Sequence, residues 1–253
     1  DRKKITENWN DGAAAAGKRR THCVRNTSGL SQPCCVSGGK PEGRGGKEMT
    51  AKKVVRNIEP DDPMLQYSGR IDDDDPKAPV LIYAASWVKM IFTGTSVAVT
   101  LANHHAYWTN EMGYLLDGVQ GRIRLLNDGK KKTYEIAGQL PDARHELMLF
   151  KRMDACHTVT FYGFTVDGGA DLLPPESKSA RRMEVFGDSV SCGEVSEAVD
   201  YVGKEDPVHD GQYSNSWYSY AWMTARKLGA ELHDTSQGGI ALLDGTGWFG
   251  APA

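Results

Sequence analysis

Short alternating runs of apolar and polar residues, separated by turn residues, fill the chain from about residue 52 to residue 173. In residues 97–101, for example, Val97, Val99 and Leu101 would share one face of a strand. Further runs of this kind cover residues 88–92, 114–116, 123–126, 146–150 and 158–166. Because no helical period separates them, these short strands predict an antiparallel β-sandwich with a jelly-roll topology. Asp117-Gly118 and Asn127-Asp128-Gly129 predict hairpin turns.

The pattern changes after Leu173. Residues 174–180 contain two prolines and two serines and are interpreted as a linker. Residues 182–186 and residues 231–235 each predict a strand. A strand, a helix and a second strand in this order predict the beginning of a doubly wound parallel sheet with three α/β/α layers. The expected fold class is therefore an all-β sandwich followed by an α/β domain.

The helix expected between these strands covers residues 216–228. Ser214 or Asn215 is a plausible N-cap, and Gly229 is a suitable residue to end the helix. The face expected to be buried carries residues at helical spacing, namely Trp217, Ala221, Thr224 and Leu228.

The first of these strands ends at Gly187-Asp188-Ser189. A glycine there allows a sharp turn, so the hydroxyl of Ser189 would stand at the carboxyl end of the strand as a nucleophile. Backbone N–H groups of Ser189 and of Gly238 or Gly239, at the end of the second strand, are candidate oxyanion donors, which contribute ~3–4 kcal/mol each in acyl transfer. We interpret Asp188 as a residue that orients the loop through hydrogen bonds.

Other reactive residues have structural interpretations. Cys192 is expected to be a packed thiol, because nothing nearby would lower its pKa. His233 falls within the second strand and is expected to be structural, whereas His209 lies in a loop that a fold could bring to the cleft as a base. His104-His105 would point to opposite faces of a strand, which argues against a shared metal ion.

Several segments together resemble a known family. Residues 186–194, FGDSVSCGE, resemble the first block of the SGNH (GDSL) hydrolases. Further segments resemble carbohydrate esterase family 2, at residues 65–70, 145–147, 161–164, 194–201, 213–220 and 237–249. The resemblance extends from about Leu65 to Phe249.

This resemblance implies a serine esterase that removes O-acetyl groups from plant polysaccharides or oligosaccharides of the xylan or mannan type. Ser189 would attack the acetyl carbonyl and form an acetyl-enzyme, with no cofactor and no metal. The family comparison favours Gly238 as the second oxyanion donor and makes Trp248 a candidate sugar platform, with simple packing as its alternative. Two other readings stay open: an SGNH esterase or lipase acting on other acyl esters, and a non-catalytic carbohydrate-binding protein.

The expected domains are a sandwich over residues 49–173 and the first part of a hydrolase domain over residues 181–253. Residues 1–48, rich in Gly, Lys, Arg and Ser, are a disordered tail or sequence upstream of a start at Met49. With that start no signal peptide is visible and the protein would be cytoplasmic; a secreted protein is the alternative. The family's oxyanion asparagine and late catalytic histidine would lie beyond Ala253, so this chain alone is expected to be inactive.

The charge balance excludes some partners. A formal net charge of -3 does not favour nucleic-acid binding. No run approaches the roughly 18 consecutive apolar residues of a membrane-spanning helix. Composition thus favours neither a nucleic acid nor a membrane as partner, and the family resemblance implies an acetylated carbohydrate.

Overall fold

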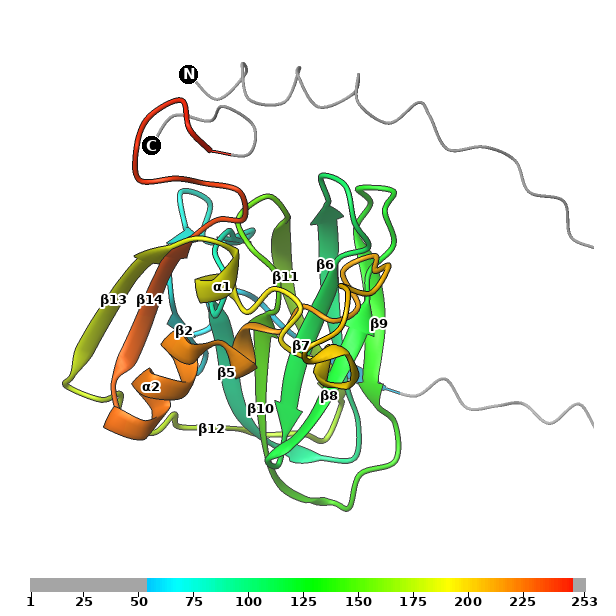
Figure 1. Ribbon diagram of the computed structural model, residues 1–253. Helices are drawn as coiled ribbons and strands as arrows, with labels where there is room; N and C mark the ends of the chain where they lie inside the picture. Colours follow the sequence, from blue (N-terminus) through cyan, green and yellow to red (C-terminus); the bar gives the residue numbers. More distant parts are fainter. Residues whose placement is uncertain (1–53, 248–253) are drawn as a thin grey trace, which may run out of the picture. The chain divides into compact units, whose positions relative to one another are not determined.

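In the computed structural model, which describes residues 54–247, the strands of the first two thirds of the chain form two antiparallel sheets (Figure 1). The first sheet has the order β3-β4-β11-β6-β9, with β1 also paired to β11. Its strands are β1 (Val55–Ile58), β3 (Ile71–Asp72), β4 (Val80–Leu81), β6 (Val97–His104), β9 (Lys132–Ala137) and β11 (Thr158–Asp167).

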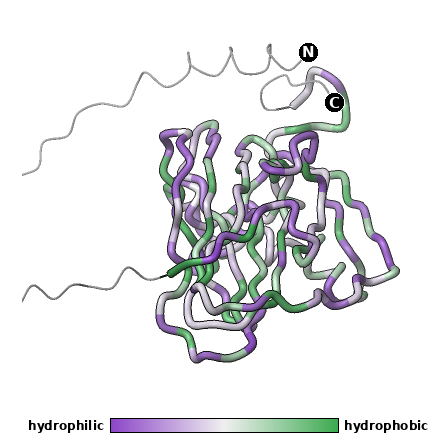
Figure 2. The backbone as a smooth tube through the Cα atoms, turned by 180° about the vertical axis from the view of Figure 1, so that it is seen from behind, coloured by the Kyte–Doolittle hydropathy of each residue, from purple (hydrophilic) through white to green (hydrophobic). Residues whose placement is uncertain are grey.

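The second sheet has the order β12-β5-β10-β7-β8, with β2 also paired to β5. Its strands are β2 (Gln66–Ser68), β5 (Trp87–Gly94), β7 (Glu111–Leu116), β8 (Val119–Arg124), β10 (Ala143–Lys151) and β12 (Leu172–Leu173). Hydrophobic and hydrophilic segments alternate along many of these strands (Figure 2). The structure thus confirms a mostly β chain, while the jelly-roll topology stays a prediction.

Both sheets contribute to one hydrophobic core. Val99 and Phe161 of the first sheet pack in the same cluster as Phe92 and Leu149 of the second, and all four are fully buried. The ring centroids of Phe161 and Phe164 lie 4.9 Å apart in an edge-to-face arrangement. Burying each such side chain stabilises the fold by roughly 1.5–3 kcal/mol. The two sheets therefore pack face to face.

Only one of the two predicted hairpins forms. Asp117 and Gly118 both have positive φ, 52° and 81°, and join β7 to β8 as a tight turn. The hairpin predicted at Asn127-Asp128-Gly129 was wrong, because β8 pairs with β7 whereas β9 crosses to the other sheet and pairs with β6. That crossing lets Tyr134 of β9 pack against the core, which the turn residues alone could not indicate.

The last third of the chain contains a parallel strand pair. β13 (Arg182–Gly187) and β14 (Glu231–Ser236) pair in register from Arg182↔Glu231 to Gly187↔Ser236, as predicted. Helices α1 (Ser189–Cys192) and α2 (Tyr220–Leu228) contact this pair. The chain also forms short 3-10 helices at η2 (Val199–Tyr201) and η3 (Ser216–Tyr218). No helix among residues 54–247 is long and apolar enough to cross a membrane.

The single helix predicted over residues 216–228 is interrupted. Ser219 has extended backbone (φ -64°, ψ 147°) and separates η3 from α2. Asn215 caps η3 by accepting from Trp217 N, as one of the two expected caps, and Ser219 caps α2 by accepting from Trp222 N. Gly229 ends α2 with a φ of 60°, as predicted.

The interruption changes which face of the helix is buried. Ala221, Trp222 and Ala225 pack against Leu232 of β14 and Phe150 of β10. Thr224 and Leu228, predicted to face the core, are exposed. The prediction was wrong there because it continued one helical phase through Ser219. The packing that results joins α2 to both the parallel pair and the second sheet.

Candidate active site

Ser189 is the first residue of α1, and only Asp188 separates it from Gly187, the last residue of β13. Asp188 is the N-cap of this four-residue helix, and its Oδ1 accepts a hydrogen bond from the Val190 N–H across 3.0 Å. The carboxylate is therefore engaged with its own turn. Ser189 is partly exposed, and its hydroxyl forms no hydrogen bond with another residue of the described part.

The turn is narrow at Gly187. A Cβ at this position would lie 2.0 Å from Ser191 Oγ and 3.3 Å from Ser236 Oγ. Ser191 is buried and its hydroxyl is hydrogen-bonded to Tyr220 OH at 2.8 Å. Glycine is needed at Gly187 because α1 packs directly onto the end of the strand.

A second turn lies beside the first. The Gln237 N–H donates to the carbonyl oxygen of Gly187 across 3.2 Å, one step beyond the last strand register pair. Gly239 follows with a φ of 76°, a conformation that favours glycine. Both turns therefore leave the carboxyl edge of the parallel pair, the edge at which ligands of α/β sheets bind.

The two candidate oxyanion glycines differ in their hydrogen bonds. The Gly238 N–H donates to Asp154 Oδ2 across 2.7 Å, so this amide already has an acceptor. The Gly239 N–H forms no hydrogen bond with another residue among 54–247. The arrangement thus favours Gly239 over Gly238 as the available donor, the opposite of what the family comparison favours.

Buried carboxyl and thiol groups surround the second turn. Glu194, whose N–H donates to the carbonyl oxygen of Ser189 across 3.0 Å, has its pKa raised by burial and by the nearby charges of Asp154 and Asp188. Burial likewise raises the pKa of the Cys192 thiol, with Asp154 and Asp234 contributing. A thiol held protonated is not a nucleophile, so Cys192 is a packing residue at this site.

The histidines that follow Ser189 occupy other surroundings. The His209 ring packs at an angle of 59° against Trp108, with ring centroids 4.4 Å apart, and its centroid lies 6.4 Å from that of the Tyr213 ring. His233 lies within β14, on the face opposite the buried Leu232 and Asp234. His104 Nε2 is hydrogen-bonded to Thr160 Oγ1 at 3.2 Å. Neither His209 nor His233 forms a hydrogen bond with Ser189.

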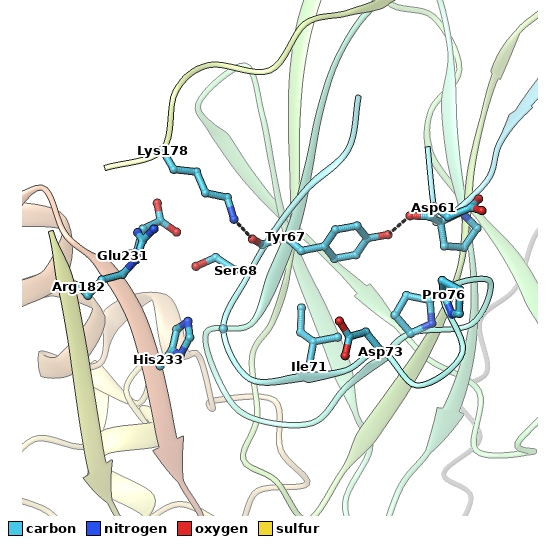
Figure 3. Close-up of a pocket in the computed structure, with 13 residues that line it drawn as sticks. Asp61, Tyr67, Ser68, Ile71, Asp73, Pro76, Lys178, Arg182, Glu231 and His233 are labelled. Atoms are coloured by element: carbon cyan, nitrogen blue, oxygen red, sulfur yellow. Dashed lines mark hydrogen bonds between the residues drawn. The ribbon is translucent and has the colours of Figure 1, made fainter. Parts of the chain in front are cut away.

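An open cavity of about 530 Å³ lies at the opposite end of the strands (Figure 3). Arg182 and Glu231, the first residues of β13 and β14, line it together with Tyr67 and Lys178. Lys178 Nζ donates to the Tyr67 carbonyl, and the Tyr67 hydroxyl donates to Pro60 O at 2.7 Å. Since Ser189 follows the last residue of β13, this cavity is separate from the candidate active site.

Two residues of the sandwich contact the site although no sequence motif predicted them there. Arg152 and Asp154, just after β10, are buried and bond to the loops around Ser189. The run Lys151-Arg152-Met153-Asp154, three charged residues directly after an apolar strand, was the available signal.

Among the described residues, no group of His, Cys, Asp and Glu could hold a metal ion. Trp248, the candidate sugar platform, lies outside the described residues.

Comparisons with known proteins agree on one family. Residues 67–175 match the family described as "Carbohydrate esterase 2 N-terminal". Over 193 residues the chain is 31% identical to the cellulase/esterase CelE of Acetivibrio thermocellus, covering 76% of this chain and 22% of that protein. Over 191 residues it is 26% identical to the acetylxylan esterase / glucomannan deacetylase of Cellvibrio japonicus, covering 75% and 51%. The chain thus spans about half of one of these relatives and less than a quarter of the other.

Solved structures show the same relationship. The structure of a family two carbohydrate esterase from Cellvibrio japonicus aligns with a TM-score of 0.67 and 23% identity, covering 79% of this chain and 57% of that one. A family two carbohydrate esterase from Clostridium thermocellum, in complex with cellohexaose, aligns with a TM-score of 0.63 and 28% identity, covering 75% and 55%. The chain is related to carbohydrate esterase family 2 over the matched residues.

Proposed function

We propose that this chain carries the nucleophile of a serine esterase that removes O-acetyl groups from plant polysaccharides or their oligosaccharides. The observation that carries the proposal is the position of Ser189. It stands at the carboxyl end of β13, beside a glycine turn held there by the bond from Gln237 N to Gly187 O at 3.2 Å. That relatives are named as acetylxylan esterase and glucomannan deacetylase supports the choice of reaction.

The chemistry follows from the two turns. Ser189 Oγ attacks the acetyl carbonyl carbon, and the carbonyl oxygen becomes an oxyanion stabilised by the N–H groups of Ser189 and Gly239. The general base takes the proton of Ser189 Oγ and passes it to the departing sugar oxygen, which leaves as a hydroxyl. Water then hydrolyses the acetyl-enzyme to acetate and restores the serine hydroxyl. These reaction steps need no cofactor and no metal.

We propose that the general base is a residue outside the described part of the chain. A serine needs a base within hydrogen-bond reach at neutral pH, and none of the residues 54–247 forms a hydrogen bond with Ser189 Oγ. We therefore expect the 253-residue chain by itself to have little esterase activity. Measurable Ser189-dependent turnover by this chain alone would contradict that expectation and would make His209 the leading candidate for the base.

The fold around the site fits the same proposal. β13 and β14 form a two-stranded parallel sheet with α1 and α2 packed against it. Isolated two-stranded sheets are marginally stable, so we propose that the complete hydrolase domain extends this pair into a three-layer α/β/α sheet beside a jelly-roll sandwich. The substrate would be an acetylated carbohydrate of the xylan or mannan type, as the names of the relatives suggest.

The experiment compares wild type with Ser189→Ala in the intact protein. Acetylated xylan and glucomannan serve as substrates, and release of acetate is measured. We expect Ser189→Ala to lower kcat by many powers of ten while the thermal unfolding curve is unchanged, as is typical of a catalytic serine. A variant that retains more than about a tenth of the turnover would show that Ser189 is not the nucleophile.

Two further arms separate the alternatives. Hydrolysis of p-nitrophenyl acetate is compared with hydrolysis of p-nitrophenyl octanoate, and strong preference for acetate is expected. Equal rates would indicate an esterase or lipase for other acyl groups. Binding of xylan or mannan oligomers without any Ser189-dependent hydrolysis would indicate a carbohydrate-binding protein instead.

A further inference from the structure

The end of β10 is unusual in its burial. Lys151, Arg152, Met153 and Asp154 are exposed by only 0%, 2%, 3% and 6%, although three of them are charged. A buried charge costs several kcal/mol unless it is paired or hydrogen-bonded. The partners of these residues therefore show what this turn of the sandwich does.

Two of the four residues hold loops of the last third of the chain. Arg152 Nε donates to Ser214 O across 3.1 Å, and its guanidinium pairs with Glu197 at 2.7 Å. The carbonyl oxygen of Arg152 accepts from the Ser216 N–H at 2.9 Å, and the carbonyl oxygen of Lys151 accepts from Ser216 Oγ at 2.7 Å. The loop after Ser189 and the loop before α2 are thus both anchored to the sandwich.

Asp154 anchors a third loop, the glycine turn after β14. Its Oδ2 accepts from the Gly238 N–H at 2.7 Å, and its Oδ1 accepts from the Cys156 N–H at 3.3 Å. A Cβ on Gly238 would lie 2.6 Å from Asp154 Oδ2 and 3.2 Å from Glu194 Oε2. Glycine is therefore needed at Gly238 because a carboxylate approaches the backbone closely.

We infer that Asp154 is a positioning residue for the oxyanion-stabilising turn, and that by holding the Gly238 N–H it leaves the next amide, that of Gly239, to face the reacting oxygen. The inference rests on the proposed function, because the oxyanion forms only if Ser189 attacks an acyl carbonyl. Asp154 itself acts through the glycine turn and does not touch the reacting atoms.

The charge of the carboxylate is offset from within the same turn. Lys151 Nζ, fully buried, donates to Met153 O at 2.6 Å and to the carbonyl oxygen of Asp154. Burial lowers the pKa of Lys151 to about 8, and the charge of Asp154 opposes that fall. The ammonium group remains largely protonated at neutral pH, so a cation and an anion are buried together beneath the turn.

The first test compares three variants in the intact protein. Asp154→Ala removes the acceptor, Asp154→Asn keeps an oxygen of the same shape, and Met153→Leu changes a buried neighbour that does not bond to Gly238. Misplacing a catalytic group by about 1 Å costs on the order of 100-fold in rate. We expect Asp154→Ala to lower kcat at least about tenfold with KM changed less than about threefold, while Asp154→Asn restores most of the kcat and Met153→Leu leaves it unchanged.

The second measurement does not depend on activity. In protein labelled with nitrogen-15 glycine, the Gly238 amide proton should resonate downfield in wild type and exchange slowly with solvent. Asp154→Ala should lose both properties. An unchanged Gly238 resonance in Asp154→Ala would show that the Gly238 N–H does not donate to Asp154, independently of any effect on activity.

Failure of the inference is distinguishable from failure of the proposed function. If Ser189→Ala abolishes hydrolysis but Asp154→Ala leaves kcat within twofold, the positioning role is wrong and the esterase assignment stands. If Ser189→Ala retains hydrolysis, the esterase assignment and the positioning role both fall.

A double-mutant cycle provides the last check. Gly238→Ala would push the carboxylate away without removing it, and the φ of Gly238 is not in the left-handed region. We expect Gly238→Ala and Asp154→Ala to lower kcat by similar factors, and the double variant to lose little more than either one, because both break the same contact. Fully multiplicative losses would show that the two residues act independently.

Discussion

The guanidinium of Arg152 lies 2.7 Å from the carboxylate of Glu197, joining a residue of the sandwich to the loop that follows Ser189. Arg152 is 2% exposed in its side chain and Glu197 is 27% exposed, so the pair is screened from solvent mainly on the arginine side. Glu197 Oε1 also accepts from Asn215 Nδ2 at 2.7 Å. One ion pair therefore fixes both the loop after Ser189 and the cap of η3.

We expect Arg152→Ala to destabilise the protein by about 3 kcal/mol, because it leaves a carboxylate and the Ser214 carbonyl without their partner. Urea unfolding monitored by tryptophan fluorescence measures the change. Arg144→Ala is the control, since its half-exposed guanidinium lies 3.7 Å from Glu146 and such surface pairs contribute about 0–1 kcal/mol. Equal losses in the two variants would contradict a structural role for Arg152.

Asp234 should make stability fall as pH rises. Burial raises its pKa to about 6, and the hydrogen bond from Ser236 opposes this only partly. Because an unfolded aspartate titrates near 3.9, the folded state holds the proton more tightly, and stability declines between about pH 4 and pH 6. Asn resembles the protonated form, so Asp234→Asn should stabilise the protein by roughly 2 kcal/mol at pH 7.5 and have little effect at pH 4.

Asp210 provides a control, because its contribution to stability should change with pH in the opposite direction. Hydrogen bonds from Thr109 lower its pKa, so its contribution is present at neutral pH and disappears in acid. Asp210→Asn should therefore destabilise slightly at pH 7.5. Paired urea titrations of both variants at the two pH values decide the matter, and a stabilisation by Asp234→Asn that did not depend on pH would refute the assigned cause.

The pair of His145 and Asp117 should stabilise the β7–β8 turn in a defined pH window. Burial lowers the pKa of His145, but hydrogen bonds to Asp117 at 2.7 Å and to Pro141, with the charge of Asp117, raise it overall. Burial alone would raise the pKa of Asp117. The hydrogen bond from the Glu146 N–H and the interaction with His145 outweigh burial, so the pKa of Asp117 is lowered overall. Protonated His145 and ionised Asp117 coexist between about pH 4 and pH 6.5.

The stability that His145 contributes is complete below its unfolded pKa of about 6.5 and is lost as pH rises through the folded value. Asp117→Asn keeps a turn residue that tolerates the φ of 52° and an oxygen for the Glu146 N–H. It removes only the charge. We expect the variant to be less stable than wild type at pH 5.5 and nearly equal to it at pH 8.5. An equal deficit at both values would exclude the ion pair as the cause.

The sequence predicted the features that depend on local pattern. The parallel strands β13 and β14, the tight turn at Asp117-Gly118 and the helix end at Gly229 follow from alternation or from residues suited to positive φ. The break at Ser219 was missed because serine is compatible with both a helix and its cap.

Contacts between distant residues were beyond such reasoning. Asp154 and Gly238 are 84 positions apart, and their bond exists only because the end of β10 packs beneath the turn after β14. The pairing of β9 with β6 likewise depends on which core the strand can reach. The position of the turn at Gly187-Asp188-Ser189 could be predicted from the sequence, whereas the residues that hold its neighbours in place could not.

Gly229 should matter through its backbone alone. Its φ is 60° and nothing lies within 4 Å of an added Cβ, so Gly229→Ala introduces backbone strain without a clash. We expect a loss of about 1 kcal/mol. Gly229→Asn, a residue that adopts this conformation more readily, should lose about half as much. Thermal unfolding of the two variants tests the order, and an alanine variant as stable as wild type would contradict it.

Gly187→Ala should displace the turn that carries Ser189, the proposed nucleophile, through a clash with a single residue. The new Cβ would lie 2.0 Å from Ser191 Oγ and 2.7 Å from Ser191 Cβ, so α1 and Ser189 with it would have to shift. A displacement near 1 Å costs on the order of 100-fold in rate, and esterase turnover of the intact protein should fall by at least that factor. Ser191→Ala is the control: it loses only the hydrogen bond to Tyr220, about 1 kcal/mol, and should keep turnover within about tenfold.

The decisive variant combines Gly187→Ala with Ser191→Gly, which removes both atoms of the clash. Ser236 Oγ, 3.3 Å from the new Cβ, would remain as a contact that a small movement relieves. We expect the turnover of the double variant to be at least about tenfold higher than that of Gly187→Ala alone. If it recovers none while remaining folded, the requirement for glycine arises from the backbone rather than from the packing of α1, and the close contact between Gly187 and Ser191 does not control the position of Ser189.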